Sequence, residues 1–330
     1  MKLFGLWFLL FLVIVSLPAW SEPLDPDEIN AASFDDKDAA KPALVLKAQV
    51  LLDRNSYSPG VIDGRYGEAT RIALKAFQTD KGLEATGRLD QATFAKLSQD
   101  DAEPVLTRYK IEPQDVSGPF EEKIPEKIED MAKLKRLAFT GPLELLAERF
   151  HMDEELLKRL NPEADFTKAG TEIIVAAAEA PKEGRGAAEN GKAEKIVVDK
   201  SDNTLRVLGK DGDLIALYPA TIGSKNNPAP DGETKITRIA KGPTWNYDPE
   251  LELEGHKDRP EQAMTIKAGP NNPVGTVWIA LDRNHYGIHG TAEPDKVGKN
   301  NSSGCVRLTN WDVEELAELV RKGMTVSFEG

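Results

Sequence analysis

The spacing of apolar residues changes along the chain, and this change most constrains the fold. In the first half, apolar side chains recur every three or four positions, which is the period of amphipathic helices. From Lys195 onward, short runs rich in Val, Ile, Leu and Thr alternate with Gly and Pro turns, which is typical of strands. Residues 178–194 lie between and have the Ala, Gly and Pro composition of a flexible linker. A chain of 330 residues also exceeds one ordinary domain, so we predict a multidomain α+β protein.

Residues 41–98 form the first helical unit. Two stretches place apolar side chains on one helix face, and a third short stripe follows a Gly turn. The stripes are Leu44, Ala48, Leu51 and Leu52, then Ile72, Ala73, Ala76 and Phe77, then Phe94 and Leu97. This pattern predicts a small three-helix bundle.

The same unit resembles the peptidoglycan-binding domain 1 family over nearly its full length. The likeness depends on Gly60, Asp63, Gly64, Gly67, Thr70, Ala76, Phe77, Gln78, Gly82, Leu83, Thr86, Gly87 and Asp90 in series. The resemblance implies a module that binds peptidoglycan. The simpler alternative is that any small helical bundle needs such turns and stripes.

A second helical unit is predicted at residues 135–177. One helix begins after Thr140, and another has Asp153 as its N-cap and ends at Asn161-Pro162, before a strand from Thr171. This order resembles a LysM domain in which residues 137–141 replace the opening strand. The resemblance implies either glycan recognition or a structural remnant.

The N-terminus reads as a secretory signal peptide at residues 1–21. Lys2 precedes an apolar run from Leu3 to Val15, and small residues follow Pro18. The alternative is an uncleaved membrane anchor, since the run approaches the ~18 residues that span a bilayer. We therefore expect export to the periplasm or cell envelope, with membrane attachment only if the signal is uncleaved.

The region at residues 195–330 predicts a mostly β domain with one late helix. Strands are expected at 196–198, 204–208, 214–217, 234–239, 264–267, 277–281 and 325–328. Asp211-Gly212 lies between two of them and is a hairpin signal. The helix is expected to have Asn310 as its N-cap and to end before Gly323.

Cys305 is the only cysteine of the chain, so no internal disulfide can form. A thiol attacks as its thiolate, so it needs a neighbour that takes its proton or holds its charge. His289 lies sixteen residues upstream, after a short apolar approach that a strand could provide. Gly304 and Gly290 flank the two residues, which would let a substrate approach the backbone and its amides face an oxyanion. The alternative is a buried cysteine that acts as a small apolar residue.

The sequence around these residues resembles the L,D-transpeptidase catalytic domain of the YkuD family. The matching segments are "YPATIGS" from Tyr218, "PDGETKIT" from Pro230, "NPVGTVWIAL" from Asn272, "IHGT" from Ile288 and "SSGCVRL" from Ser302. The resemblance covers residues 195–329. One departure is Ser303, where many family members have His.

The resemblance implies that Cys305 attacks a peptidoglycan stem tetrapeptide with His289 as its base, through a thioester. Gly304 and Cys305 would line the oxyanion hole, and the carbonyl of Gly290 would orient the histidine. Arg307 could pair with a substrate carboxylate through its planar fork, or form a structural salt bridge instead. Substrate contacts are also expected at Ser302, Ser303 and Tyr286. The family implies no cofactor and no metal.

The acceptor of the acyl group stays open at this level. An amine would give a 3→3 cross-link or attach an envelope lipoprotein, whereas water would give an L,D-carboxypeptidase. A noncatalytic peptidoglycan-binding scaffold is the alternative from another class. A zinc site at His256, His285 and His289 is disfavoured, since Gly287 and its β-favouring neighbours argue against the helix it would need. The net charge of -13 disfavours a nucleic-acid partner.

Overall fold

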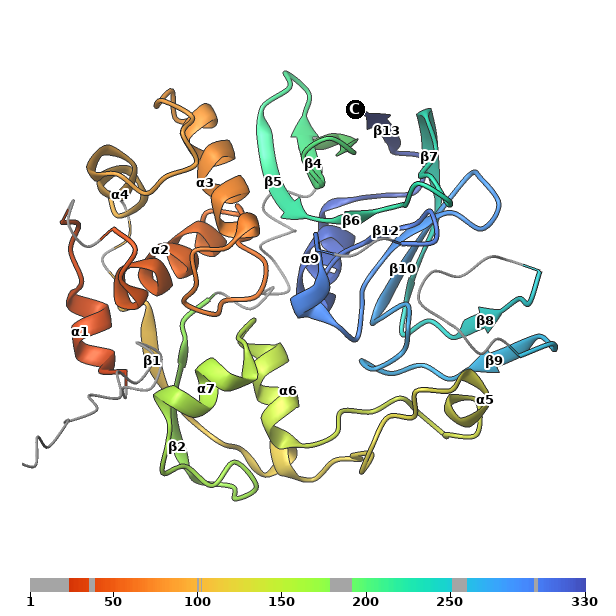
Figure 1. Cartoon of the computed structure of the whole chain (residues 1–330), viewed down its shortest axis with the longest axis horizontal. Coiled ribbons are helices and arrows are strands. Elements are labelled where there is room, and N and C mark those ends of the chain that lie inside the picture. The colour runs from red at the N-terminus through yellow and green to blue at the C-terminus, as the bar shows by residue number, and fades with distance from the viewer. Residues whose placement is uncertain are drawn as a thin grey trace, which may run out of the picture.

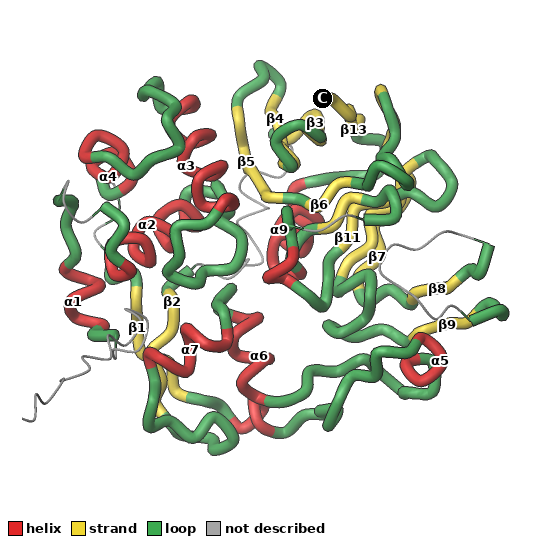
Figure 2. The backbone as a smooth tube through the Cα atoms, viewed as in Figure 1, coloured by secondary structure: helices red, strands yellow, loops and turns green. Residues whose placement is uncertain are grey.

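The computed structural model describes residues 24–35, 39–99, 101, 103–178, 192–250, 260–299 and 302–330. The predicted signal peptide (1–21) and most of the predicted linker (178–194) lie outside them and stay predictions. Most helices gather on one side of the molecule and most strands on the other (Figure 2). No helix in this described part is both long and apolar enough to cross a bilayer.

The N-terminal helices include the predicted three-helix bundle, and two buried glutamines hold its turns. The side chain of Gln49 accepts from the N–H of Gly64 at 2.7 Å and donates to the carboxylate of Asp63 at 2.9 Å. Gln78 likewise accepts from the N–H of Gly87 at 2.8 Å. Asp63, Gly64, Gln78 and Gly87, which belong to the family motif, therefore all serve to hold the turns between the helices. The helices are α1 (Pro26–Ala31), α2 (Pro42–Arg54), α3 (Glu68–Asp80) and α4 (Gln91–Leu97).

The second helical unit is a strand, two helices and a strand. β1 (Leu106–Lys110) pairs antiparallel with β2 (Glu172–Ala176), and α6 (Pro142–Arg149) and α7 (Glu154–Leu160) lie between them in sequence. Asn161 fastens α7 to β2, because its side chain accepts from the N–H of Ile174 at 2.6 Å and donates to the carbonyl of the same residue at 2.7 Å. The expected helix pair and closing strand are therefore present.

This unit begins earlier than residue 135, and its opening strand is not replaced by residues 137–141. The strand is β1, and residues 111–141, with η1 (Pro113–Val116) and α5 (Ile128–Met131), separate it from α6. Most side chains of β1 are exposed or partly exposed, so the strand has little apolar pattern. The long insertion and the polar strand together explain why the sequence did not predict it.

The C-terminal domain is built on one mixed sheet, and the predicted mostly β domain is confirmed. Within the described residues, nine strands form it in the order β5-β4-β3-β13-β7-β10-β11-β12-β6. The pairs β3–β13 and β11–β12 are parallel, and the other pairs are antiparallel. The strands are β3 (Ala193–Asp199), β4 (Thr204–Gly209), β5 (Leu214–Pro219), β6 (Thr221–Ile222), β7 (Gly232–Lys241), β10 (Val277–Leu281), β11 (Gly287–His289), β12 (Val306–Arg307) and β13 (Thr325–Glu329).

The late helix is α9 (Asn310–Leu319), and it lies against β10 and β11 (Figure 1). Its N-cap is Thr309, whose hydroxyl accepts from the N–H of Asp312 at 3.0 Å, and not Asn310 as expected. Buried apolar side chains of the strands and of α9 form the domain core. They include Val277, Ile279, Ile288, Val306, Val313 and Leu316.

A separate hairpin lies beside the sheet. β8 (Trp245–Tyr247) pairs antiparallel with β9 (Met264–Ile266), and both pack with Ile128 of α5 and Leu137 in a small apolar cluster. The insertion of the second helical unit therefore reaches the C-terminal domain (Figure 1). Residues 251–259 lie between these two strands in the sequence and are outside the described residues.

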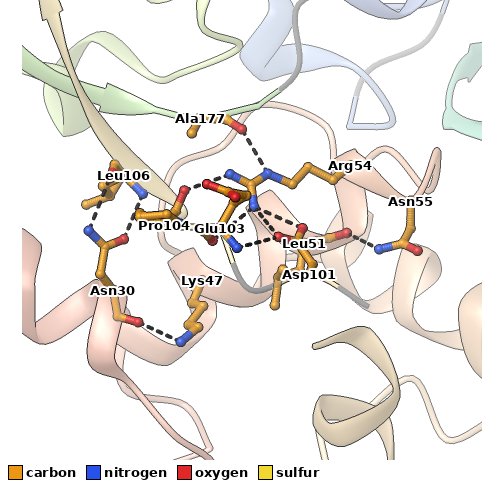
Figure 3. Close-up of polar contacts among 10 residues, drawn as sticks. All are labelled: Asn30, Lys47, Leu51, Arg54, Asn55, Asp101, Glu103, Pro104, Leu106 and Ala177. Carbon is orange, nitrogen blue, oxygen red and sulfur yellow. Dashed lines mark hydrogen bonds and ion pairs between the residues drawn. The ribbon is translucent and has the colours of Figure 1, made fainter. Parts of the chain in front are cut away.

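The helical bundle is joined to the strand pair of the second unit through Arg54 (Figure 3). The guanidinium of Arg54 forms an ion pair with Asp101 at 2.7 Å. It also donates to the carbonyls of Pro104 at 2.7 Å and Ala177 at 2.9 Å. One side chain at the end of α2 thus holds the segments that lead into β1 and out of β2.

The sheet domain touches both helical units at a second junction. The backbone of Leu217 in β5 exchanges hydrogen bonds of 2.9 Å with Ser56 and Ser58, which follow α2. His151, in the turn after α6, is buried, with its Nδ1 3.1 Å from Asp53 Oδ1. Its ring stacks on Trp311 of α9, with centroids 5.1 Å apart. The three units therefore pack as one continuous body.

Candidate active site

Three neighbouring strands place a row of side chains on one face of the sheet. Trp278 of β10 lies directly opposite His289 of β11, and His289 lies opposite Arg307 of β12. The residues between them in sequence, such as Ile279, Ile288 and Val306, point to the other face and enter the core. The row therefore lies on the face away from that core.

The imidazole of His289 is fixed at one edge by its own backbone neighbour. His289 is 5% exposed, and its Nδ1 lies 2.6 Å from the carbonyl oxygen of Gly290. A carbonyl only accepts, so the bond assigns the proton to Nδ1 and leaves the lone pair on Nε2. Burial, aided by the nearby charge of Arg307, lowers the pKa of His289 to about 3, although the bond to Gly290 opposes the shift. The ring is therefore neutral at neutral pH, and its Nε2 carries no proton.

The backbone of Gly290 lies close against the start of α9. The side chain of Asn310 accepts from the N–H of Thr276 at 3.0 Å and donates to the carbonyl of Pro270 at 3.2 Å. A Cβ at Gly290 would lie 2.3 Å from Asn310 Oδ1. Gly290 is thus needed for the close approach of helix and strand. No local pattern indicated that Asn310 has this role.

Cys305 lies immediately before β12, beside the start of β11. Its Sγ donates to the carbonyl of His285 at 3.4 Å, and the backbone N–H of Gly287 bonds to the sulfur. Burial raises the pKa of the partly buried thiol to about 11, while the Gly287 N–H and the charge of Arg307 oppose the rise. The parallel pairing of β11 with β12 thus brings the predicted nucleophile next to the strand that carries His289.

Gly304 gives the nucleophile its position. Its φ is +100°, and a Cβ there would lie 2.8 Å from the ring of Tyr286 and 3.4 Å from the carbonyl of Pro228. Only glycine suits both the backbone conformation and the space. Tyr286 therefore packs against the turn of the nucleophile, with its ring partly buried against the core of the sheet domain.

Ser302 braces this turn internally. It is 1% exposed, and its hydroxyl donates to the carbonyl of Cys305 at 2.6 Å. The same carbonyl accepts from the N–H of Gly223 at 3.3 Å. The hydroxyl of Ser302 is therefore engaged within this turn, and a substrate contact at Ser302 stays a prediction. Ser303 is partly buried beside it.

Arg307 lies beside both predicted catalytic residues, with its guanidinium partly buried. In the described part of the chain, no carboxylate forms an ion pair with it, and its buried Nε has no hydrogen-bond partner. Burial lowers its pKa, while Glu293 and Cys305 nearby oppose the shift. The structural salt bridge that the sequence left open is therefore not observed among these residues.

The described residues contain no group of three or more potential metal ligands. His289 lies in β11, and His285 lies in the preceding turn with a φ of +68°, so the two do not share a helix face. His256 lies outside the described residues. Trp245, Tyr247 and Met264 belong to the small apolar cluster of the β8–β9 hairpin.

Comparison with known families identifies both the sheet domain and the bundle. Residues 193–327 match the family described as "L,D-transpeptidase catalytic domain", and residues 41–97 match "Putative peptidoglycan binding domain". Both ranges follow the boundaries of the sheet domain and of the three-helix bundle.

Curated relatives carry the same family name. The chain is 30% identical to "Putative L,D-transpeptidase YkuD" of Bacillus licheniformis over 187 residues, which are 56% of this chain and 92% of the relative. It is 30% identical to "Probable L,D-transpeptidase YbiS" of Escherichia coli strain K12 over 192 residues, 57% of this chain but only 60% of that relative.

A solved structure was also found, L,D-transpeptidase 3 from Mycobacterium tuberculosis in complex with a faropenem-derived adduct. It has 16% identity, a TM-score of 0.34, and coverage of 42% of this chain and 60% of that chain. This likeness is too low to support an argument. The identity and coverage of the Bacillus relative are sufficient, and the chain belongs to the L,D-transpeptidase family of the YkuD type.

Proposed function

We propose that this protein is a cell-envelope L,D-transpeptidase that uses Cys305 as nucleophile and His289 as general base on peptidoglycan stem tetrapeptides. The observation that carries the proposal is the pairing of β11 with β12. The sulfur contacts the carbonyl of His285, in the turn before β11, and the N–H of Gly287 in β11. The same strand carries His289, whose Nε2 is left without a proton. The reaction class is inferred from the family, and the roles of Cys305 and His289 are inferred from their contacts.

In the first half of the reaction, the sulfur bonds to the carbonyl carbon of the third stem residue. The thiol proton passes to Nε2 of His289 as this S–C bond forms. The C–N bond to the terminal D-Ala then breaks, and the imidazolium returns the proton to the leaving amine. The products are a thioester on Cys305, free D-Ala and a neutral His289.

In the second half, an acceptor attacks the thioester. Its nucleophilic nitrogen or oxygen bonds to the carbonyl carbon and gives a proton to His289. The S–C bond breaks, and the thiolate recovers that proton. An amine acceptor yields a 3→3 cross-link or a bound lipoprotein, and water yields a trimmed tripeptide, as an L,D-carboxypeptidase would.

The pKa shifts favour a neutral resting pair. Burial raises the pKa of Cys305 and lowers that of His289, so thiol and imidazole both stay uncharged near neutral pH. His289 is therefore favoured as a general base that removes the thiol proton during attack. The alternative, an imidazolium that stabilises a thiolate already present in the resting enzyme, is disfavoured. The proton leaves the sulfur only during attack on the carbonyl.

Arg307 supplies the positive charge of the site. We assign it the binding of a substrate carboxylate, because its partly buried guanidinium has an unpaired Nε and lies beside Cys305. The backbone amides at Gly304 and Cys305 would hold the oxyanion, as the family implies. The bundle at residues 41–98 would hold the enzyme on peptidoglycan, and the LysM-like unit would support it.

Acylation by a carbapenem tests the assignment of the nucleophile. Intact-mass spectrometry of the full chain should show one covalent adduct, and peptide mapping should place it at Cys305. Cys305→Ser should lose the adduct, and His289→Gln should form it much more slowly. An adduct that forms on Cys305→Ser at full yield would refute the assignment. A chain that never forms an adduct and yields no product from stem peptides would favour the scaffold.

A further inference from the structure

Trp278 lies against the face of the proposed base. The indole of Trp278 and the imidazole of His289 are stacked, with centroids 5.3 Å apart and planes 17° apart. The two residues are direct partners in the β10–β11 pairing. We infer that Trp278 is a positioning residue that holds the plane of the His289 imidazole for proton transfer. This inference rests on the proposed function.

The indole occupies a space that the strand leaves open for it. Gly287 lies two residues before His289, on the same face of β11. A Cβ at Gly287 would lie 2.6 Å from Cζ2 of Trp278 and 2.8 Å from Cε2. Any larger residue at 287 would therefore displace the ring. The absence of a side chain at Gly287 thus leaves room for the indole of Trp278 beside His289.

The stack restricts a motion that the hydrogen bond alone leaves free. The bond from Nδ1 to the carbonyl of Gly290 fixes one edge of the imidazole, but the ring can still tilt about that edge. The indole removes this freedom on one face, and Arg307 on β12 neighbours the other side of the strand. Proton transfer depends steeply on position, since a misplacement of about 1 Å can cost roughly 100-fold in rate.

Core packing does not account for Trp278. The side chains of β10 alternate, and Val277, Ile279 and Leu281 are the ones that enter the core of the sheet domain. Trp278 is only partly buried and lies on the opposite face. Its removal is therefore expected to affect the histidine more than the stability of the domain.

Three variants of the full chain test the inference by kinetics. Trp278→Leu should lower kcat for a stem tetrapeptide by roughly 10- to 100-fold while KM changes by less than about threefold. Trp278→Phe keeps a flat aromatic face and should recover kcat to within about threefold of wild type. Trp245→Leu, which removes a tryptophan from the β8–β9 hairpin, is the matched control and should leave kcat unchanged. Equal kcat in Trp278→Leu and wild type, or equal loss in the Leu and Phe variants, would overturn the inference.

Nitrogen NMR of the imidazole gives a readout that does not need turnover. Wild type should show one fixed tautomer of His289, with the proton on Nδ1, and His289→Gln assigns the signals. Trp278→Leu should let the ring tilt out of line with the Gly290 carbonyl, which weakens the hydrogen bond that holds the proton on Nδ1. The signals should therefore move toward the average of the two tautomers. An unchanged tautomer in Trp278→Leu would refute the positioning role. If wild type has no activity on any stem peptide, the proposed function fails, and the spectra still decide this inference.

Discussion

Replacing Asp312 by asparagine should stabilise the protein in alkaline solution. Asp312 is fully buried in α9 at the junction of the three units, near His151 and Asp53. Burial raises its pKa from 3.8 to about 6, although His151 opposes the shift. This difference of about 2 units, at 1.36 kcal/mol per unit, makes the ionised carboxylate cost about 3 kcal/mol of folding free energy.

The sign of the pH dependence follows from the direction of the shift. The folded state binds the proton of Asp312 more tightly than the unfolded state, so this cost is absent below about pH 4 and complete above about pH 6. The pKa of His151 is also raised, by Asp53 against the opposing effect of burial. Its stabilising charge is present below the unfolded pKa of 6.5 and is lost as the pH rises through the higher folded value. Both groups therefore make the junction weaker as the pH rises.

Urea denaturation of wild type and Asp312→Asn at about pH 4.5 and about pH 8 measures the effect. The variant should gain about 2 kcal/mol relative to wild type at the higher pH, since loss of a favourable charge near the start of α9 offsets part of the gain. At the lower pH the two proteins should differ by less than about 1 kcal/mol. Asp211→Asn, in an exposed turn, is the control and should follow wild type. A variant as pH-dependent as wild type, or less stable at both values, would refute the reasoning.

Arg307→Met should lower kcat/KM for a stem peptide by roughly 10- to 100-fold, the loss of one charge-assisted hydrogen bond, and Arg307→Lys should recover only part of it. Steady-state kinetics with an amidated peptide, which lacks the carboxylate, should show no such difference. Gly290→Ala should reduce carbapenem acylation strongly, because its Cβ would collide with Asn310; a rate equal to wild type would contradict the geometry. The rate of Cys305 acylation should be flat from about pH 5 to about pH 9, since the pKa values of about 3 and about 11 lie outside that range, and stopped-flow measurement of a descending limb near pH 8 would instead indicate a standing thiolate–imidazolium pair.

Local patterns predicted most of the elements, because each signal is contained in a few consecutive residues. The strands expected at residues 204–208, 277–281 and 325–328 coincide with β4, β10 and β13, and the Asp211-Gly212 turn connects β4 to β5. β1 was not predicted, because its alternation is weak and its partner β2 lies more than sixty residues away. A strand that is stabilised by a distant partner leaves little trace in its own sequence.

In the candidate site too, residue identities could be predicted from local motifs, whereas the contacts between residues could not. Cys305, His289 and their flanking glycines were identified from residue type and motif, but their mutual placement depends on the pairing of β11 with β12. Trp278 lies in the segment from Asn272 that resembles the family. Its contact with His289, however, depends on the register in which β10 pairs with β11. Aligning the two predicted strands by their alternating faces could have indicated it. Nothing local showed that the hydroxyl of Ser302 is occupied by the carbonyl of Cys305.

The most direct test of the whole account is a comparison of muropeptides. Sacculi treated with the full chain, with Cys305→Ala and with His289→Gln are digested and their fragments weighed by mass spectrometry. We predict that the wild-type enzyme removes terminal D-Ala from stem tetrapeptides and yields cross-linked, lipoprotein-bearing or trimmed stems, whereas Cys305→Ala yields none. The same products in equal amount from Cys305→Ala would show that the sulfur is not the nucleophile.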